Sequence, residues 1–294
     1  MTIATSMWPQ VAGLVEAEKM DGMGANRRWT PKNDLQALFL EKYFLPLRNS
    51  AAKIPEITSV VSRSAEVINK FLADNGFTIE LDPFSPQGFG TASILDLLLK
   101  WRTEGEVRPI VEAGTDKVHT GVRIDGEDSR FYFSDRHPFW IAGLATKTKD
   151  VAYMTVAHQA PRDEFELMGM IENIESGVLG SKNSKFAGVV YPMVDLQKIV
   201  DISFLIGMET VGNDGDPAII SQALLEVIEK INQLGSRTKV AFAAGIEKCC
   251  AKPTEDLEIT QPFFYWIRRP GLKSPLVCAY LTPEVWNDPG NIEA

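Results

Sequence analysis

The strongest constraint on the fold is a pair of apolar segments near the end of the printed sequence. LEITQPFFYWI covers residues 257–267, and SPLVCAYLTP covers residues 274–283. Between them, Pro270 and Gly271 form a typical turn signal. Short runs of aromatic and β-branched residues on either side of a turn predict two paired strands. We expect the aromatic run at 263–266 to be core strand rather than an exposed binding site, because large apolar side chains are mostly buried.

The rest of the chain mixes strand and helix patterns without regular alternation. Short runs rich in Val, Ile, Tyr and Phe predict strands, and apolar residues at helical spacing predict helices. The predicted strands cover residues 107–112, 119–124, 130–134, 138–146 and 151–157. The predicted helices cover residues 33–49, 56–75, 85–101, 162–176 and 195–207. This arrangement favours an α+β fold over a doubly wound sheet.

Two segments need separate treatment. Residues 1–32 are mixed in composition, so we expect an amino-terminal arm that is irregular apart from one short helix, followed by a single domain over 33–294. Residues 217–232 contain good helix formers, yet Ala223, Leu225, Val227 and Ile231 alternate with polar residues, and only Glu229 breaks the pattern. We predict a strand there from about residue 222.

Charge and cysteine content exclude some functions. The chain has 39 acidic and 30 basic residues and a net charge of −9, which disfavours nucleic acid and anionic lipid as partners. Three cysteines do not form a disulfide framework. The first residues lack a secretory pattern, and no apolar run approaches the roughly 18 residues that span a bilayer. We therefore expect a cytoplasmic protein that does not bind membranes.

The sequence contains no recognisable catalytic or metal-binding motif. Walker, GxGxxG, HExxH, CxxC and GxSxG patterns are all missing, so no catalytic residue, metal ligand or cofactor is predicted. The three histidines, His119, His137 and His158, are scattered along the chain. The Cys249-Cys250 pair lies near Lys248 and Lys252, which weakly favours thiolate formation, but we favour the interpretation as two reduced thiols that are packed or half-exposed.

The segment 257–285 resembles the end of a serpin. Gln261, Pro262 and Phe263 match the family's signature after the reactive loop, followed by a similar "SPL" segment and a closing Pro283; Thr260 departs from the usual Asp or Asn. Upstream, INQLGS at 231–236 is similar to the serpin segment that leads into the hinge. The resemblance implies mixed sheets with helices packed at one end. The helical part is truncated, because the stretch between 101 and 119 is too short for the usual body.

The resemblance implies that residues 235–262 correspond to the reactive loop of serpins. It implies a hinge at Gly235, Ser236, Arg237, Thr238 and Lys239, and a bait region at Glu247, Lys248, Cys249, Cys250 and Ala251. Residues 236–246 alternate between an apolar and a more polar face, as a strand does. Inhibitory hinges consist of small residues, whereas this one has Arg237, Lys239 and the bulky Phe242. We therefore predict that the segment is already part of a sheet.

Three functional hypotheses follow. The first is a non-inhibitory serpin-like protein that acts by binding another protein. The second is a serine or cysteine protease inhibitor with its bait bond at 247–252. The third is an enzyme that uses a pocket with Cys249, Cys250 or His158. We prefer the first because catalytic motifs are missing and the hinge is altered. The identity of the partner, a protease among the candidates, and the oligomeric state stay open.

Overall fold

The largest sheet joins both ends of the chain. The computed structural model describes residues 1–20, 29–182, 185–212, 215, 217–234 and 255–292. Its seven-stranded antiparallel sheet has the order β1-β17-β16-β8-β7-β6-β9. The strands are β1 Ile3–Thr5, β17 Val277–Leu281, β16 Phe263–Arg268, β8 Val151–Val156, β7 His137–Ala145, β6 Ser129–Ser134 and β9 Val178–Ser181. The predicted hairpins over 138–157 and 257–283 are therefore confirmed.

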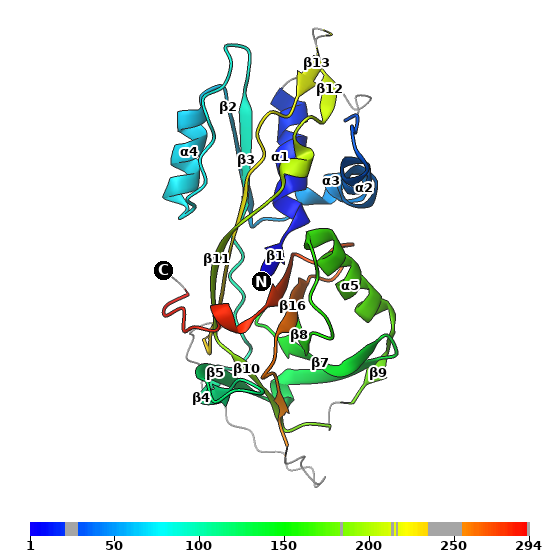
Figure 1. Ribbon diagram of the computed structural model, residues 1–294, viewed down its shortest axis with the longest axis vertical. Coiled ribbons are helices and arrows are strands. Elements are labelled where there is room, and N and C mark those ends of the chain that lie inside the picture. The colour runs from blue at the N-terminus through cyan, green and yellow to red at the C-terminus, as the bar shows by residue number, and fades with distance from the viewer. Residues whose placement is uncertain (21–28, 183–184, 213–214, 216, 235–254, 293–294) are drawn as a thin grey trace.

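A smaller sheet lies at the lower end in Figure 1. It has the order β15-β10-β5-β4, with β15 parallel to β10 and the other pairs antiparallel. The strands are β4 Glu106–Val111, β5 Val118–Asp125, β10 Gly188–Pro192 and β15 Leu257–Glu258. The strands predicted at 107–112 and 119–124 are confirmed within one or two residues.

Two of the helices begin where the sequence supplies a capping side chain. The Oδ1 atom of Asn33 accepts the backbone N–H of Gln36 at 2.9 Å, and Asp163 accepts that of Glu166 at 2.8 Å. The helices are α1 Met7–Met20, α2 Asp34–Phe39, α3 Leu45–Ala51, α4 Ala65–Asp74 and α5 Glu164–Ser176, with a π-helical turn Leu40–Phe44 joining α2 to α3. Single turns of 3-10 helix cover Gly126–Asp128, Ser203–Leu205 and Pro283–Val285. The helices predicted at 33–49 and 162–176 are confirmed.

Three expectations are wrong, and one is refined. The amino-terminal arm contains the expected helix as α1, preceded by the strand β1, and Trp8 at the start of α1 is fully buried. The predicted helix 56–75 is a strand, β2 Ile57–Ser62, followed by α4. The predicted buried helix 85–101 contains the strand β3 Gly90–Leu95, and Leu98 is exposed. The predicted helix 195–207 is the strand β11 Val194–Val200 followed by a 3-10 turn.

Tertiary pairing explains these differences. β2 and β3 hydrogen-bond to each other in register, and β11 pairs along its full length with β14 Leu225–Ile231. In β11 the buried residues Val194, Leu196 and Val200 alternate with more exposed ones, which is a strand pattern with a period of two. The strand predicted from about residue 222 is confirmed as β14. A short hairpin, β12 Glu209–Val211 and β13 Pro217–Ile219, connects β11 to β14.

Two apolar cores hold these layers together. The large core contains all four residues of the aromatic run 263–266, so the prediction that this run is core strand is confirmed. A small separate core lies between α4 and the β2–β3 pair, around Ile68, Leu72, Ala92 and Ile94. In Figure 1 the two sheets occupy the lower part of the molecule and α1, α2, α3 and α4 the upper part. Among the described residues, no helix is both long and apolar enough to cross a bilayer.

Candidate functional site

The segment before residue 235 is fixed by the side chain and carbonyl of one buried asparagine. Asn232 is 1% exposed, and its Nδ2 atom donates to the Gly290 carbonyl oxygen at 2.7 Å. Its Oδ1 atom accepts the backbone N–H of Leu234 at 2.9 Å, and its carbonyl oxygen accepts the indole N–H of Trp101 at 2.9 Å. With both polar atoms of its side chain and its carbonyl oxygen engaged, Asn232 fixes the position in which the chain leaves β14.

The segment after residue 254 is fixed by an ion pair and a short ladder. Arg123 donates to the Asp256 carboxylate at 2.8 and 3.1 Å, and this hydrogen bonding is the main reason that the pKa of Arg123 lies above its ordinary value. The backbone N–H of Ala187 donates to the Glu255 carbonyl oxygen at 2.8 Å. β15 then pairs with β10. The segment 235–254 therefore starts and ends at fixed points of the scaffold.

Only part of the predicted site lies among the described residues. The hinge Gly235–Lys239 and the bait region Glu247–Ala251 lie outside them. Of the signature residues, Gln261 is exposed, the Pro262 carbonyl oxygen accepts the N–H of Ala157 at 2.8 Å, and Phe263 is fully buried in β16. The Thr260 carbonyl oxygen accepts the N–H of Ala113 at 2.8 Å. These residues anchor the end of the loop and do not form a reactive group.

The strand pairs β2–β3 and β11–β14 form two separate sheets, and no ladder joins β3 to β14 within the described residues. Side-chain and backbone bonds link their surroundings instead. At the end near residue 235, Trp101 donates to Asn232, and the N–H of Gly105 donates to the Gln233 carbonyl oxygen at 2.9 Å. The chain that follows β3 is thereby fixed to the chain that follows β14.

At the other end of β14, Glu226 is the centre of a second link. Its carboxylate accepts the N–H groups of Thr78 and Ile79 at 2.6 and 3.1 Å, the Thr78 hydroxyl at 3.0 Å, and the Nε2 of Gln197 at 2.8 Å. Burial alone would raise the pKa of Glu226, but these hydrogen bonds outweigh it and hold the pKa below its ordinary value. The extended segment 77–82 after α4 is thus attached to β14.

Two hydrogen bonds between the Gln222 side chain and the Asp82 backbone reinforce this link. The N–H of Asp82 donates to the Oε1 atom of Gln222 at 2.7 Å, and the Nε2 atom of Gln222 donates to the Asp82 carbonyl oxygen at 3.1 Å. Phe77, Ile79 and Leu81 in the same segment pack on the small core below α4. We name the contacts of Glu226 and Gln222 with residues 77–82 the Glu226 link. It connects the core of the β2–β3 pair to the strand that leads to residue 235.

The opposite face of β14 carries a carboxylate without such partners. Side chains alternate along a strand, so Glu229 lies on the face of Leu225, Val227 and Ile231, which belongs to the large core. Burial raises the pKa of Glu229 to about 8. Burial also raises the pKa of the nearby Tyr265, with a further increase from the Glu229 charge. The break in alternation seen in the sequence is therefore a carboxyl group in an apolar environment.

The histidines and the described cysteine do not form a reactive centre. The Nε2 atom of His137 is 2.8 Å from the Thr155 hydroxyl, and the ring of His158 lies 5.2 Å from that of His137. His119 contacts Trp286 and Glu112. Burial raises the pKa of the Cys278 thiol, which disfavours the nucleophilic thiolate. Within the described ranges, no group of three His, Cys, Asp or Glu residues could hold a metal ion.

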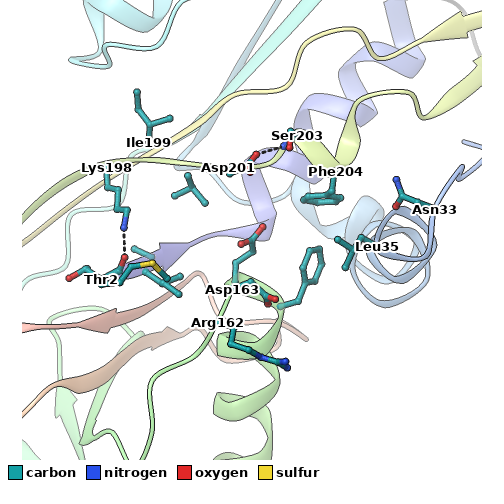
Figure 2. Close-up of a pocket in the computed structure, with 16 residues that line it drawn as sticks. Thr2, Asn33, Leu35, Arg162, Asp163, Lys198, Ile199, Asp201, Ser203 and Phe204 are labelled. Carbon is teal, nitrogen blue, oxygen red and sulfur yellow. Dashed lines mark hydrogen bonds between the residues drawn. The ribbon is translucent and has the colours of Figure 1, made fainter.

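A groove lies between β1, the start of α2, the start of α5 and the end of β11. Its volume is about 630 Å³. Figure 2 shows Asp201 and Asp163 on opposite sides of the space, with Phe204 and Leu35 at one end and Lys198 and Thr2 at the other. Sequence reasoning missed this groove and the Glu226 link, because both join segments that are far apart in the chain.

No protein-family model and no curated protein matches the sequence. Solved structures do match the fold. Serpin48 from the insect Tenebrio molitor has a TM-score of 0.55 at 11% identity, covering 95% of this chain and 91% of that one. The mouse protein-Z dependent protease inhibitor has a TM-score of 0.54 at 11% identity, covering 95% and 90%. Thyroxine-binding globulin, solved with thyroxine, has a TM-score of 0.54 at 11% identity, covering 95% and 92%.

The chain therefore has a serpin-like fold of the α+β class, as its signature residues indicate. The likeness extends over nearly the whole chain, including residues 1–101, where the sequence resemblance is weakest.

Proposed function

We propose that this protein is a non-inhibitory serpin-like protein that acts by binding another protein. The observation that carries the proposal is the Glu226 link. Inhibition by a serpin-type trap requires the cleaved loop to enter the sheet next to β14. Here Glu226 connects β14 to the segment 77–82, which packs against α4. Separating β14 from this segment therefore requires these contacts to break.

The free energy of the contacts supports this view. A hydrogen bond to a charged group contributes about 1.5–3 kcal/mol, and the four that Glu226 accepts share one carboxylate, so their contributions are less than additive. The bonds from Trp101 and Gly105 to residues 232 and 233 must also break if the region opens near the loop. The hinge sequence also departs from the small residues typical of inhibitory hinges at Arg237 and Lys239.

Protease inhibition is the second candidate. It is favoured by the fixed attachment of both ends of the segment 235–254, through Asn232 on one side and Asp256 on the other, since a bait loop must be presented from a rigid frame. Two of the structures with a similar fold are named as a protease inhibitor and a highly specific serpin.

Incubation with a panel of serine and cysteine proteases separates the two candidates. The proposed function predicts cleavage within 235–254 as an ordinary substrate, with free protease recovered and no complex that survives denaturing electrophoresis. A stable complex with the protease would contradict it. The variant Thr238→Pro serves as a control, because a proline in the hinge removes a backbone donor from any inserted strand and would abolish such a complex without preventing cleavage.

A further inference from the structure

The groove between β1, α2, α5 and β11 has the size of a binding site. A volume of about 630 Å³ lies within the roughly 300–1,000 Å³ typical of ligand pockets. Four segments that are distant in sequence line it, at residues 1–4, 33–35, 162–165 and 198–204. Its shape is therefore fixed by the tertiary fold rather than by one loop.

The two basic side chains of the groove are already engaged. The Nε atom of Arg162 donates to Glu166 at 2.9 Å, and in Figure 2 its side chain points away from the space between Asp163 and Asp201. The Nζ atom of Lys198 donates to the Thr2 carbonyl oxygen. Arg162 is therefore paired with a residue outside the groove, and the N-terminal ammonium of Met1 lies 3.9 Å from Glu284, which does not line the groove either. The Thr2 carbonyl is neutral, so the charge of Lys198 remains and offsets one of the acidic side chains, and the groove keeps an excess of negative charge.

Three carboxylates face the same space. Asp163 accepts the N–H of Glu166, and Asp201 accepts that of Ser203 at 2.9 Å, which leaves each with unused acceptor positions. Glu164 is only 8% exposed, and the hydrogen bond that it receives comes from its own backbone N–H. Burial raises the pKa of Glu164, and the charges of Asp163 and Asp201 raise it further. A positive charge in the groove would relieve this burial penalty and this repulsion.

Apolar side chains border the carboxylates. Phe165 and Phe204 meet edge to face with ring centroids 5.1 Å apart. Beside them, Leu35 is 46% exposed and Ile199 is 58% exposed. Large apolar residues that stay accessible around a depression are typical of a contact surface.

We infer that this groove is the docking site for a segment of a partner protein that presents an arginine or lysine side chain next to an apolar one. The inference rests on the proposed protein-binding function and identifies the surface that carries it. Charge complementarity selects the occupant: the cation lies between Asp163, Glu164 and Asp201, and the apolar side chain lies against Phe204 and Leu35. Arginine is suited to this position because its guanidinium group donates to several carboxylate oxygens at once.

The first test uses two blocked dipeptides as probes. N-acetyl-leucyl-argininamide supplies both features, and N-acetyl-leucyl-citrullinamide replaces the charged guanidinium by a neutral urea of the same shape. Binding is measured on the ¹⁵N-labelled full chain by NMR titration. We expect the arginine probe to bind at least about tenfold more tightly, since a charged hydrogen bond contributes more than about 1.4 kcal/mol. Its shifts should cluster at Glu164, Ile199 and Phe204. Equal affinities, or shifts elsewhere, would overturn the inference.

Matched variants test the contribution of the carboxylates. Glu164→Gln and Asp201→Asn keep the side-chain shape and remove one charge each, and each should weaken the arginine probe about tenfold. Asp74→Asn removes the same charge from the exposed face of α4 and should leave the affinity unchanged. Unchanged binding in both groove variants, or equal weakening in all three, would contradict the inference.

A third probe separates a protein-docking surface from a site for small amines. Argininamide carries the cation without the leucine, and the inference predicts that it binds more weakly than the dipeptide. Binding as tight as that of the dipeptide would show that the apolar border does not contribute, and would overturn the docking interpretation. These results are independent of loop cleavage, so failure of the groove and failure of the non-inhibitory proposal can be told apart.

Discussion

The seven-stranded sheet and the β2–β3 and β11–β14 pairs are stabilised in different ways. In the large sheet, a continuous backbone ladder joins β1 to β9, and the inner strand β16 is buried over residues 263–267. The two pairs have no ladder between them in the described part of the chain, and side-chain hydrogen bonds around Glu226 and Asn232 connect their surroundings. The first region is held by many equivalent contacts, and the second by a few specific ones.

This difference has a mechanical consequence. Loss of one side chain in the large sheet should lower the stability of the whole molecule, because its residues share one core. Loss of the Glu226 side chain should favour local opening between β14 and the segment 77–82, while the large sheet stays folded. Local opening depends on how contacts are distributed in the structure. The following predictions test this contrast, from the largest effect to the smallest.

Trp266→Ala should have the largest effect on the free energy of unfolding. The indole is 1% exposed, stacks on Tyr153 with ring centroids 5.3 Å apart, and donates to Glu175 at 2.8 Å. Removing a buried aromatic residue of this size destabilises a protein by about 3–5 kcal/mol. Urea denaturation measures the change. Leu179→Ala, at a position 65% exposed on the edge strand β9, is the control and should shift stability by less than about 0.5 kcal/mol.

Glu229→Gln should change how stability depends on pH. The folded-state pKa of Glu229 is about 8, above its ordinary value, so the folded protein binds more protons than the unfolded one from about pH 4.5 to pH 8. Wild-type stability must therefore fall as pH rises through this range. The variant lacks this loss, so it should gain about 4 kcal/mol of stability over wild type at pH 8 and less than about 1 kcal/mol at pH 5. A stability difference between variant and wild type that stays constant from pH 5 to pH 8 would refute the assignment.

Glu226→Ala should lower stability by about 3 kcal/mol, because four donors lose their acceptor. The amides of Thr78 and Ile79 should then exchange through local opening, far faster than the amides of β16, whose exchange follows global unfolding and speeds up only by the loss of global stability. Native-state hydrogen exchange distinguishes the two regions. Glu80→Ala, which changes an exposed carboxylate in the same segment, should leave both unchanged. Exchange at Thr78 and Ile79 that stays as slow as in β16 would show that the two regions open together.

Lys70→Ala should have the smallest effect. Lys70 and Asp74 form an i,i+4 ion pair at 2.7 Å on α4, and both side chains are largely exposed. Pairs of this kind contribute about 0.3–0.5 kcal/mol and are screened by salt. Chemical denaturation at low and high ionic strength should show a difference that shrinks with salt. A loss above about 1 kcal/mol would mean that α4 contributes more to the Glu226 link than its contacts indicate.

Local patterns predicted most of the large sheet. The runs at 130–157 and 257–283 combine strand-forming residues with clear turns, and both became paired strands. The prediction was wrong where two patterns compete. Residues 195–207 have helix-forming residues and an alternating apolar set, and pairing with β14 decides for the strand. The burial of β1 could not be predicted locally, because it depends on pairing with a strand at the other end of the chain.

The site was less predictable than the fold. The signature residues Gln261, Pro262 and Phe263 located the anchor after the loop, because they lie together in sequence. Glu226 and Thr78 are 148 residues apart, and Trp101 and Asn232 are 131 apart, so no local spacing reveals either contact. The groove has the same origin, because its carboxylates on α5 and β11 meet only after folding. The break in alternation at Glu229 was the one visible signal of an unusual group in β14.

The most direct test of the central claim is thermal unfolding before and after limited proteolysis between residues 235 and 254. β14 is tied to its surroundings through Glu226 and Asn232, and the proposed non-inhibitory function implies that cleavage does not lead to strand insertion. We therefore predict a melting temperature that stays the same or falls slightly after cleavage. A large rise would show that the cut loop had entered the sheet as a new strand, and would contradict the central claim.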